Sequence, residues 1–310
     1  MTEEKSGIAI LGVFVADLAF RADRMPAMGE TIFGTGFKMG PGGKGSNQSV
    51  AAARLGARVT FISRLGQDDF GAVAQSTWRT EGITARIVES PDGPTGAAFI
   101  YVNERTGENA IIVAPGVAES ISAEDVESAA DAIRGAAVFV TQLEQPIPAA
   151  KRALEIARAA GVATILNPAP AAPLDDAIFA LCDYVTPNET ETSELTGMEV
   201  VTIDQARAAG DALLAKGVGT AVITLGENGA LVHGSGVSEH VPVFNAGPVV
   251  ETTGAGDAFN GGFAVALAEG RSPVEAARFG CAVAGISVTR PGTAPSMPTR
   301  AEIDALLAKG

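Results

Sequence analysis

Between residues 136 and 224 the sequence alternates short apolar, β-branched runs with longer helix-forming segments. Strands are expected at 137–141, 162–166, 184–186 and 220–224, and helices at 149–160 and 203–216. Parallel strands need a helix-length crossover, so this alternation predicts an α/β fold with a doubly wound, mostly parallel sheet flanked by helices. The 310 residues can bury a large core, and we expect a single domain over 1–310.

The N-terminal part of the chain departs from this alternation. An apolar run at Ile8–Val15 predicts a strand buried on both faces of the main sheet. Thr31–Met39 resembles an exposed strand, and Ala97–Asn103 with Ala110–Ala114 gives a hairpin signal. These segments predict either a small separate β-sheet, a lid built from about 14–41 and 95–115, or extra edge strands of the main sheet.

The charge of the chain excludes one class of function. A formal net charge of −14, with no cluster of Lys and Arg, argues against a nucleic-acid surface. Cys182 and Cys281 lie far apart without metal-type spacing, which predicts reduced thiols. The start does not resemble a signal peptide, and the apolar run ending at Phe20 is broken by Asp17, so we expect a cytoplasmic protein with no membrane contact.

A glycine-rich turn precedes an apolar run in the C-terminal part of the chain. Gly254, Ala255 and Gly256 come directly before Asp257, and a helix is expected through 263–267. Free backbone N–H groups and the positive end of the helix dipole favour an anion at such a turn. Asp257 is then either a capping residue or a general base beside the anion, and this stretch alone leaves both interpretations open.

A second glycine-rich loop runs from Gly40 to Gln48 and precedes a helix expected at 49–55. Its G-x-G-x-x-G pattern suggests a dinucleotide site, but about 25 irregular residues separate it from the first buried strand, so the fingerprint is weak. A better interpretation is close approach of the backbone to a polyhydroxylated ligand, with Lys44 and Asn47 as donors.

Polar residues repeatedly follow the ends of the predicted strands, where α/β sheets bind ligands: Asp17, Glu144, Asn167, Asn188 and Gly226. Asn188 and Glu191 share one face of a helix start, so they predict either a capping box or a magnesium site. The Gly- and Pro-rich loop 287–296 is either a monovalent-cation site or a plain connection to a last helix at 300–309.

Taken together, these stretches resemble the ribokinase-like carbohydrate kinases, also called the phosphofructokinase B family, along essentially the whole chain. The resemblance rests on five segments: Gly42–Gln48, Asn167–Pro170, Thr186–Glu191, Ile223–Gly226 and Thr252–Gly261. It implies ATP-dependent phosphorylation of a primary hydroxyl, in the first instance that of D-ribose to give ribose 5-phosphate, with Mg²⁺ as cofactor and K⁺ as activator. It also implies a homodimer formed through two lids.

The resemblance assigns roles residue by residue. Asp257 matches the catalytic base, and Gly254, Ala255 and Gly256 match the anion hole. Positions that match the sugar site are Asp17, Gly42, Gly43, Lys44, Asn47 and Glu144. Positions that match the nucleotide site are Asn188, Thr224, Gly226, Asn228, Gly256 and Cys281, with Glu191 linked to Mg²⁺. Positions that match the monovalent-cation site are Glu251, Thr253, Ser287, Arg290, Gly292 and Ser296.

Three positions depart from the family pattern. Val15 stands where ribokinases have Asn, which removes a polar contact from the sugar site and places ribose itself in question. Glu251 replaces the usual Asp near the expected cation site, and Cys281 stands near where a His or Asn meets adenine. The alternatives are another pentose, a ketose or a nucleoside as acceptor, a sugar-sensing regulatory protein with weak catalysis, and an NAD(P)-dependent oxidoreductase.

Overall fold

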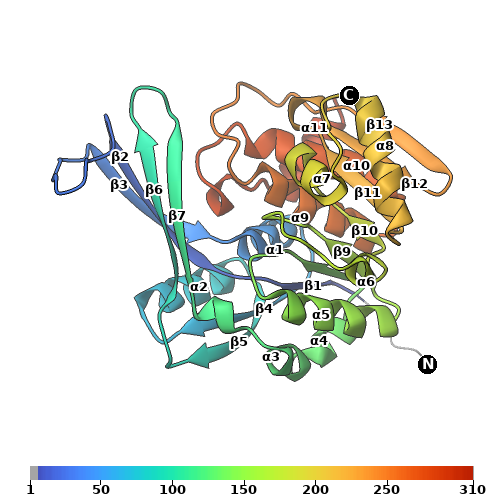
Figure 1. Cartoon of the computed structure of the whole chain (residues 1–310), viewed down its shortest axis with the longest axis horizontal. Helices are drawn as coiled ribbons and strands as arrows, with labels where there is room; N and C mark the ends of the chain where they lie inside the picture. Colours follow the sequence, from blue (N-terminus) through green and yellow to red (C-terminus); the bar gives the residue numbers. More distant parts are fainter. Residues whose placement is uncertain (1–5, 310) are drawn as a thin grey trace.

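The computed structural model describes residues 6–309, and its centre is a nine-stranded sheet (Figure 1). The strand order is β13-β12-β11-β10-β9-β8-β1-β4-β5, parallel from β5 to β11 and antiparallel at the β12 and β13 edge. The strands are β1 Ile8–Leu11, β4 Val59–Gly66, β5 Thr84–Ser90, β8 Val138–Thr141, β9 Ala163–Leu166, β10 Tyr184–Val185, β11 Thr220–Thr224, β12 Ala230–Gly234 and β13 Val237–Val241.

Helices cover both faces of this sheet and form two separate cores. One core holds side chains from α1 Lys44–Arg54, α2 Asp69–Thr80, α9 Ala255–Ala268, α10 Pro273–Ser287 and α11 Arg300–Leu307. The other holds side chains from α3 Ala123–Ser128, α4 Ala130–Gly135, α5 Ile147–Ala159, α6 Asp176–Phe179, α7 Glu189–Thr196 and α8 Ile203–Ala215. This two-sided covering confirms the predicted doubly wound architecture.

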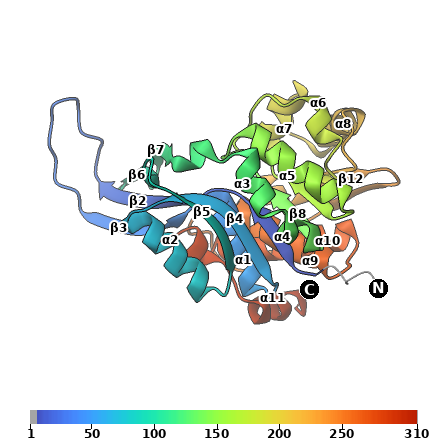
Figure 2. The same cartoon turned by 90° about the horizontal axis from the view of Figure 1, so that it is seen from below.

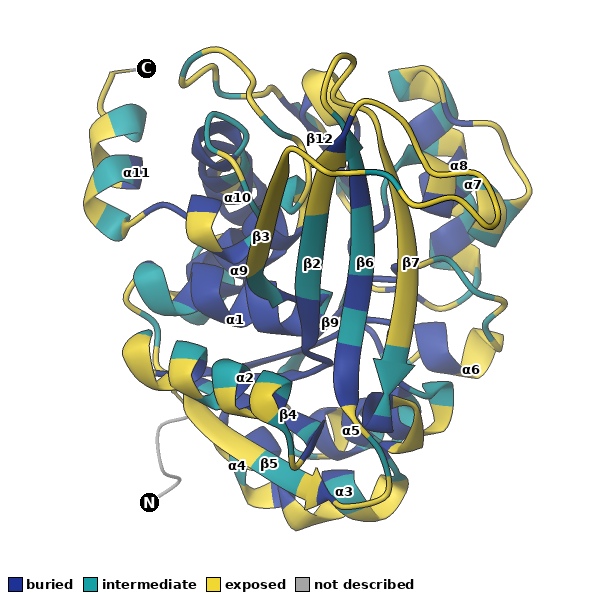
Figure 3. Ribbon diagram, turned by 90° about the vertical axis from the view of Figure 1, so that its left-hand side faces the viewer, coloured by how far each residue is buried: buried dark blue, intermediate teal, exposed yellow. Residues whose placement is uncertain are grey.

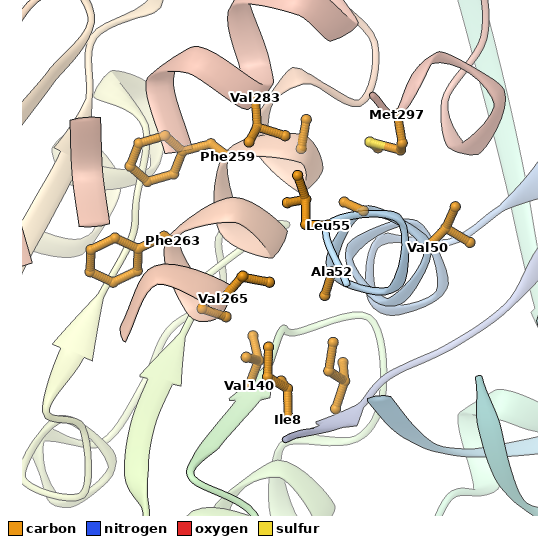
Figure 4. Close-up of a cluster of buried hydrophobic side chains, with 14 of the residues drawn as sticks. Ile8, Val50, Ala52, Leu55, Val140, Phe259, Phe263, Val265, Val283 and Met297 are labelled. Atoms are coloured by element: carbon orange, nitrogen blue, oxygen red, sulfur yellow. The ribbon is translucent and has the colours of Figure 1, made fainter. Parts of the chain in front are cut away.

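Alternation along the central strands explains the two cores. In β1, Ile8 and Ile10 pack into the first core, whereas Ala9 and Leu11 pack into the second, because successive side chains of a strand point to opposite faces. Figure 4 shows the first core, where side chains of β1 and β8 lie beneath those of α1 and α9.

No helix among residues 6–309 is long and apolar enough to cross a membrane.

A second sheet stands apart from the first, at the left of Figure 1. Its order is β3-β2-β6-β7, formed by β2 Val15–Ala22, β3 Gly36–Gly42, β6 Thr95–Asn103 and β7 Asn109–Gly116. Figure 2 shows that the connection between β2 and β3 projects away from the rest of the protein. Figure 3 shows that β3 and β7 are the more exposed strands of this small sheet. The prediction of a separate small sheet is confirmed, and the alternative of extra edge strands in the main sheet is wrong.

Some predicted boundaries are wrong. The expected strand Ile8–Val15 is two strands: β1 ends at Leu11, and Val15 begins β2 in the small sheet. Asp17 therefore lies within a strand of the small sheet and not after a strand of the main one. The strand expected at Thr31–Met39 lies later, at Gly36–Gly42, and the helix expected from Ser49 already begins at Lys44.

Candidate active site

The N-terminus of α9 lies at the carboxyl end of the main sheet and presents Asp257. Gly254 adopts φ +84° just before the helix, a conformation that glycine accepts without strain. No side chain caps this helix end, so the interpretation of Asp257 as the capping residue is wrong. The N–H of Ala255 donates to the carbonyl of Thr252 at 3.1 Å. The N–H groups of Gly254 and Gly256 have no backbone acceptor within residues 6–309 and remain available to an anion.

The Asp257 carboxylate is buried and held by two side-chain amides. Asn47 Nδ2 donates to Oδ2 at 3.0 Å, and Gln48 Nε2 donates to Oδ1 at 3.1 Å. Burial raises the pKa of Asp257, while the charge of Lys44 and the two amide hydrogen bonds oppose that rise. The arrangement is that of a carboxylate kept away from water yet partly stabilised as an anion, as a general base requires.

Close backbone packing brings α1 to this carboxylate. Gly43 has φ +89°, and a Cβ at this position would lie 2.4 Å from the carbonyl oxygen of Val13. A Cβ on Gly45 would lie 2.7 Å from the Cα of Gly12, just after β1. Glycines in this loop therefore let the start of α1 pass directly against the end of β1, which places Lys44 and Asn47 beside Asp257.

Three ionisable side chains, Asp17, Lys44 and Glu144, interact electrostatically with the Asp257 carboxylate. The backbone N–H of Lys44 donates to Glu144 Oε2 at 2.8 Å. Burial raises the pKa of Glu144 to about 7, with Lys44 opposing the shift and Asp257 and Asp17 adding to it. Burial likewise raises the pKa of Asp17 to about 6. Burial alone would lower the pKa of Lys44, but the surrounding carboxylates raise it. The structure thus brings Asp17, Lys44, Asn47, Glu144 and Asp257 into one cluster.

Asn188 and Glu191 form the capping box that one interpretation predicted. Asn188 Oδ1 accepts from the N–H of Glu191 at 2.8 Å, and Glu191 Oε2 accepts from the N–H of Asn188 at 2.9 Å. Both residues also line a cavity of about 160 Å³ together with Lys44, Gly254, Gly256 and Asp257. Capping and facing the cavity are compatible, because a carboxylate has several lone pairs.

This cavity has the donor set that Mg²⁺ prefers with a bound nucleotide. Mg²⁺ usually takes one or two protein carboxylates and completes its shell with phosphates and water. Glu191 supplies such an oxygen, and residues 6–309 contain no cluster of three or more acidic, His or Cys ligands that would form an all-protein cage. The residues present therefore fit Mg²⁺ held mainly by a nucleotide.

The other residues of the expected nucleotide site are only partly brought together. Thr224 lines the same cavity as Asn188 and pairs with it in an isolated parallel bridge. Gly226 and Asn228 form a short exposed 3₁₀ helix directly after β11. Cys281 lies within the first core at 5 % exposure, and burial raises the pKa of its thiol to about 12. It does not line the cavity, so its assignment remains a prediction.

The segments of the expected monovalent-cation site meet each other. Glu251 Oε2 accepts from the N–H of Gly292 at 2.8 Å, and the N–H of Glu251 donates to the carbonyl of Val288. The hydroxyls of Ser287 and Ser296 donate to nearby carbonyls. Arg290 pairs its guanidinium with Glu302, so only its backbone oxygen is suited to a cation. Thr253 is exposed nearby in sequence.

Sequence reasoning assigned no role to several polar side chains that support the site. Gln48 is fully buried and bonds Asp257, Asn167 and Gln142. Asn260 accepts from Thr186 and donates to the carbonyl of Gly256. Their only sequence signal is position, since Gln48 closes the Gly42–Gln48 segment and Asn260 follows Asp257 by one helical turn.

Comparison with known proteins agrees with this geometry. Residues 5–300 match the model of the pfkB family carbohydrate kinases. The chain is 42 % identical over 296 residues to a ribokinase of Haemophilus influenzae, covering 95 % of this chain and 96 % of that protein. It is 38 % identical over 294 residues to a deoxyribokinase of Salmonella typhimurium, covering 94 % and 95 %.

A solved structure supports the same conclusion. The Arabidopsis thaliana ribokinase complexed with ribose and ATP superposes with a TM-score of 0.91 at 32 % identity, covering 98 % of this chain and 99 % of that one. A family match over nearly the whole sequence, full-length relatives and the shared fold all agree. The chain belongs to the pfkB family of carbohydrate kinases.

Proposed function

We propose that this protein transfers the γ-phosphoryl group of ATP to the primary hydroxyl of D-ribose, giving ribose 5-phosphate and ADP. The observation that carries the proposal is the buried Asp257 carboxylate, held by two amides at an uncapped helix N-terminus. The relatives named ribokinase, including one complexed with ribose and ATP, support the choice of substrate.

The proposed chemistry uses two features of the start of α9: the Asp257 carboxylate and the nearby backbone N–H groups. Asp257 takes the proton of the sugar hydroxyl as its oxygen attacks the phosphorus, and the bond from phosphorus to the leaving oxygen of ADP breaks. The anion hole at Gly254, Ala255 and Gly256 stabilises the negative charge of the transferring phosphoryl group. The N–H groups of Gly254 and Gly256 carry this role, because that of Ala255 already donates to the carbonyl of Thr252. Lys44, which lines the same cavity, adds a positive charge.

The sugar site is proposed at the cluster beneath the small sheet. Asp17 and Glu144 accept from sugar hydroxyls, Lys44 and Asn47 donate to them, and Gly42 and Gly43 allow close approach of the backbone. The buried Asn47 Oδ1 has no hydrogen-bond partner among the described residues. A sugar hydroxyl would satisfy it, because buried polar atoms are normally paired.

The nucleotide is proposed to lie along Asn188, Thr224, Gly226 and Asn228, with Cys281 near the base. Mg²⁺, when bound through Glu191 and the phosphates, neutralises phosphate charge. A K⁺ ion at Glu251, Thr253, Ser287, Arg290, Gly292 and Ser296 would stabilise the loop that meets the start of α9. Turnover measured with and without K⁺ in a sodium buffer tests that site, and equal rates would contradict it.

The small sheet is proposed to act as a lid and as the contact of a homodimer. Asp17 lies on one of its faces, and the opposite face carries Phe20, Phe37, Met39 and Ile112, which are 41 %, 61 %, 43 % and 65 % exposed. An exposed apolar face of this kind marks an interaction surface. A second copy of the chain would cover this face. We further propose that the enzyme is cytoplasmic.

A second acceptor is favoured by one observation. Val15, at 6 % exposure, begins β2 two residues before Asp17 and offers no hydrogen bond to a sugar. A sugar that lacks a hydroxyl, such as 2-deoxyribose, would suit this apolar position, and relatives named deoxyribokinase are 38 % identical.

A coupled ADP-release assay over ribose, 2-deoxyribose, ketoses, hexoses and nucleosides tests the proposal. Turnover on ribose supports it, and a preference for 2-deoxyribose selects the second acceptor. Absence of turnover on every sugar and nucleoside would contradict the kinase assignment and favour a sugar-sensing protein.

A further inference from the structure

Two neighbouring amides of α1 hold Asp257, but their surroundings differ. Asn47 uses Nδ2 for Asp257 and leaves Oδ1 buried without a partner among residues 6–309. Gln48, in contrast, has a partner for each of its polar side-chain atoms. Its Nε2 donates to Asp257 at 3.1 Å and to Asn167 at 3.2 Å, and its Oε1 accepts from Gln142 Nε2 at 2.6 Å. Because an amide nitrogen carries two hydrogens, both donors of Gln48 are used by the protein itself.

The partners of Gln48 are anchored at the ends of adjacent strands. Gln142 directly follows β8, and Asn167 directly follows β9. Asn167 is fixed in turn, because its Nδ2 donates to the carbonyl of Thr186 at 3.0 Å. These bonds determine which way the Gln48 amide faces, since the reversed amide would place Oε1 against the oxygens of Asp257 and Asn167.

We propose that Gln48 is a positioning residue for the catalytic base: it fixes the orientation of the Asp257 carboxylate and stabilises it as an anion, whereas Asn47 is the contact that the sugar rearranges. The inference rests on the proposed function, in which Asp257 takes the proton. It assigns a role to a residue whose two donor hydrogens and amide oxygen already have partners within the protein.

The charges around Asp257 show why an anchoring donor matters. Lys44 on α1 is its one cationic neighbour among the groups that shift its pKa, while Asp17 on β2, Glu144 after β8 and Glu191 on α7 bring like charge. Burial also disfavours the anion. The hydrogen bond from Gln48 acts against these effects, so its removal favours the protonated carboxyl, which cannot accept the proton of the sugar.

The test compares Gln48→Met with Gln145→Met. Gln145 is also a buried glutamine, and its Nε2 donates to Thr141 Oγ1 at 2.7 Å and to the carbonyl of Gln142, but it does not contact Asp257. Gln48→Met should lower kcat roughly tenfold to a hundredfold, because a hydrogen bond to a charged group is lost. The acid limb of its kcat–pH profile should move to higher pH, with little change in the KM for sugar. Gln145→Met should keep the acid limb of the wild type.

A second substitution covers the case in which Gln48→Met does not fold. Gln48→Glu keeps the size of the side chain but places a carboxyl beside Asp257, so the acid limb should move further in the same direction. Asn47→Ala should behave differently, because Asn47 contacts the sugar: its main effect should be a raised KM for sugar. Folding is checked by thermal melts that follow the fluorescence of Trp78, the single tryptophan of the chain.

The inference fails if folded Gln48 variants keep the wild-type acid limb, or if Gln145→Met moves it equally. These results would leave the proposed function intact. If instead the wild-type protein phosphorylates no sugar, the proposed function fails, and ¹³C NMR titration of labelled aspartate carboxyls still decides the inference. The Asp257 signal, assigned by its loss in Asp257→Asn, should titrate at higher pH in Gln48→Met, and an unchanged titration would contradict the anchoring role.

Discussion

Gly42 in β3 and Asp17 in β2 lie so close that a Cβ on Gly42 would be 2.3 Å from Asp17 Oδ1. The strand pair therefore has room for the carboxylate only because residue 42 has no side chain. The atom in the way is the far end of a side chain, which can rotate at little cost in stability. A side chain at position 42 would thus displace the Asp17 carboxylate, which is proposed to bind the sugar, while leaving the fold in place.

Gly42→Ala should raise the KM for sugar roughly tenfold or more, because the Asp17 carboxylate is forced out of place. Gly40→Ala is the matched control on the same strand, since a Cβ there meets no atom within 4 Å. Steady-state kinetics with varied sugar concentration measures both. Equal KM values for the two variants would exclude Asp17 from the sugar site.

Glu144→Gln should change how stability depends on pH. Burial raises the folded-state pKa of Glu144 from 4.5 to about 7, so the folded state binds this proton more tightly than the unfolded state does. The stability gained from that proton is present below the unfolded pKa and is lost as the pH rises to about 7. The free energy of unfolding of Glu144→Gln should therefore exceed that of the wild type at pH 8 by about 1–3 kcal/mol and converge with it at pH 4.

Urea unfolding at both pH values measures this difference, with Glu239→Gln, an exposed carboxylate on β13, as the control. A stability difference independent of pH would show that Glu144 does not carry the raised pKa. The same variant should lose sugar affinity, because the neutral amide is a weaker acceptor than the carboxylate.

Val15→Asn should increase the preference for ribose over 2-deoxyribose, expressed as a ratio of kcat/KM values, by about tenfold or more. A polar pocket discriminates against a sugar that lacks the matching hydroxyl, whereas an apolar one does not. Val15→Ala opens space without adding a polar group and should leave the ratio close to that of the wild type. If Val15→Asn also leaves the ratio unchanged, position 15 does not determine specificity.

Ile112→Asp should convert the proposed homodimer to monomers. The side chain is 65 % exposed on the apolar face of the small sheet, and a buried unpaired charge at an interface is strongly unfavourable. Val201→Asp, at a residue that is 72 % exposed outside the small sheet, is the control and should remain dimeric. Light scattering after size exclusion gives the mass of each, and a monomeric wild-type protein would contradict the proposal.

The alternation of apolar and helix-forming segments was enough to predict the doubly wound sheet, because strand period and helix length are local properties. The hairpin β6–β7 was predicted for the same reason. The change of sheet after Leu11 was not, since apolar residues continue from Val13 to Val15 beyond the single glycine Gly12. At this change Gly12 lies against Gly45, which is far away in sequence: a Cβ on either glycine would be 2.7 Å from the Cα of the other.

In the candidate site, too, short-range patterns could be predicted from the sequence, whereas contacts between residues far apart in it could not. The helix start at Gly254–Asp257 and the capping box at Asn188 are short-range patterns, and both are present in the structure. The bond between Gln48 and Asp257 joins residues 209 positions apart, so no local pattern could have predicted it. Such distant pairs become visible only when the fold places the start of α1 against α9.

The central claim is that Asp257 is the base in phosphorylation of a sugar hydroxyl, and a direct measurement compares wild type with Asp257→Asn. Product formation from ribose and ATP is followed by ³¹P NMR, and ribose binding is followed by calorimetry. The account predicts that the wild type makes ribose 5-phosphate and that Asp257→Asn is slower by several orders of magnitude while binding ribose almost as well. Near-normal turnover by Asp257→Asn would contradict it.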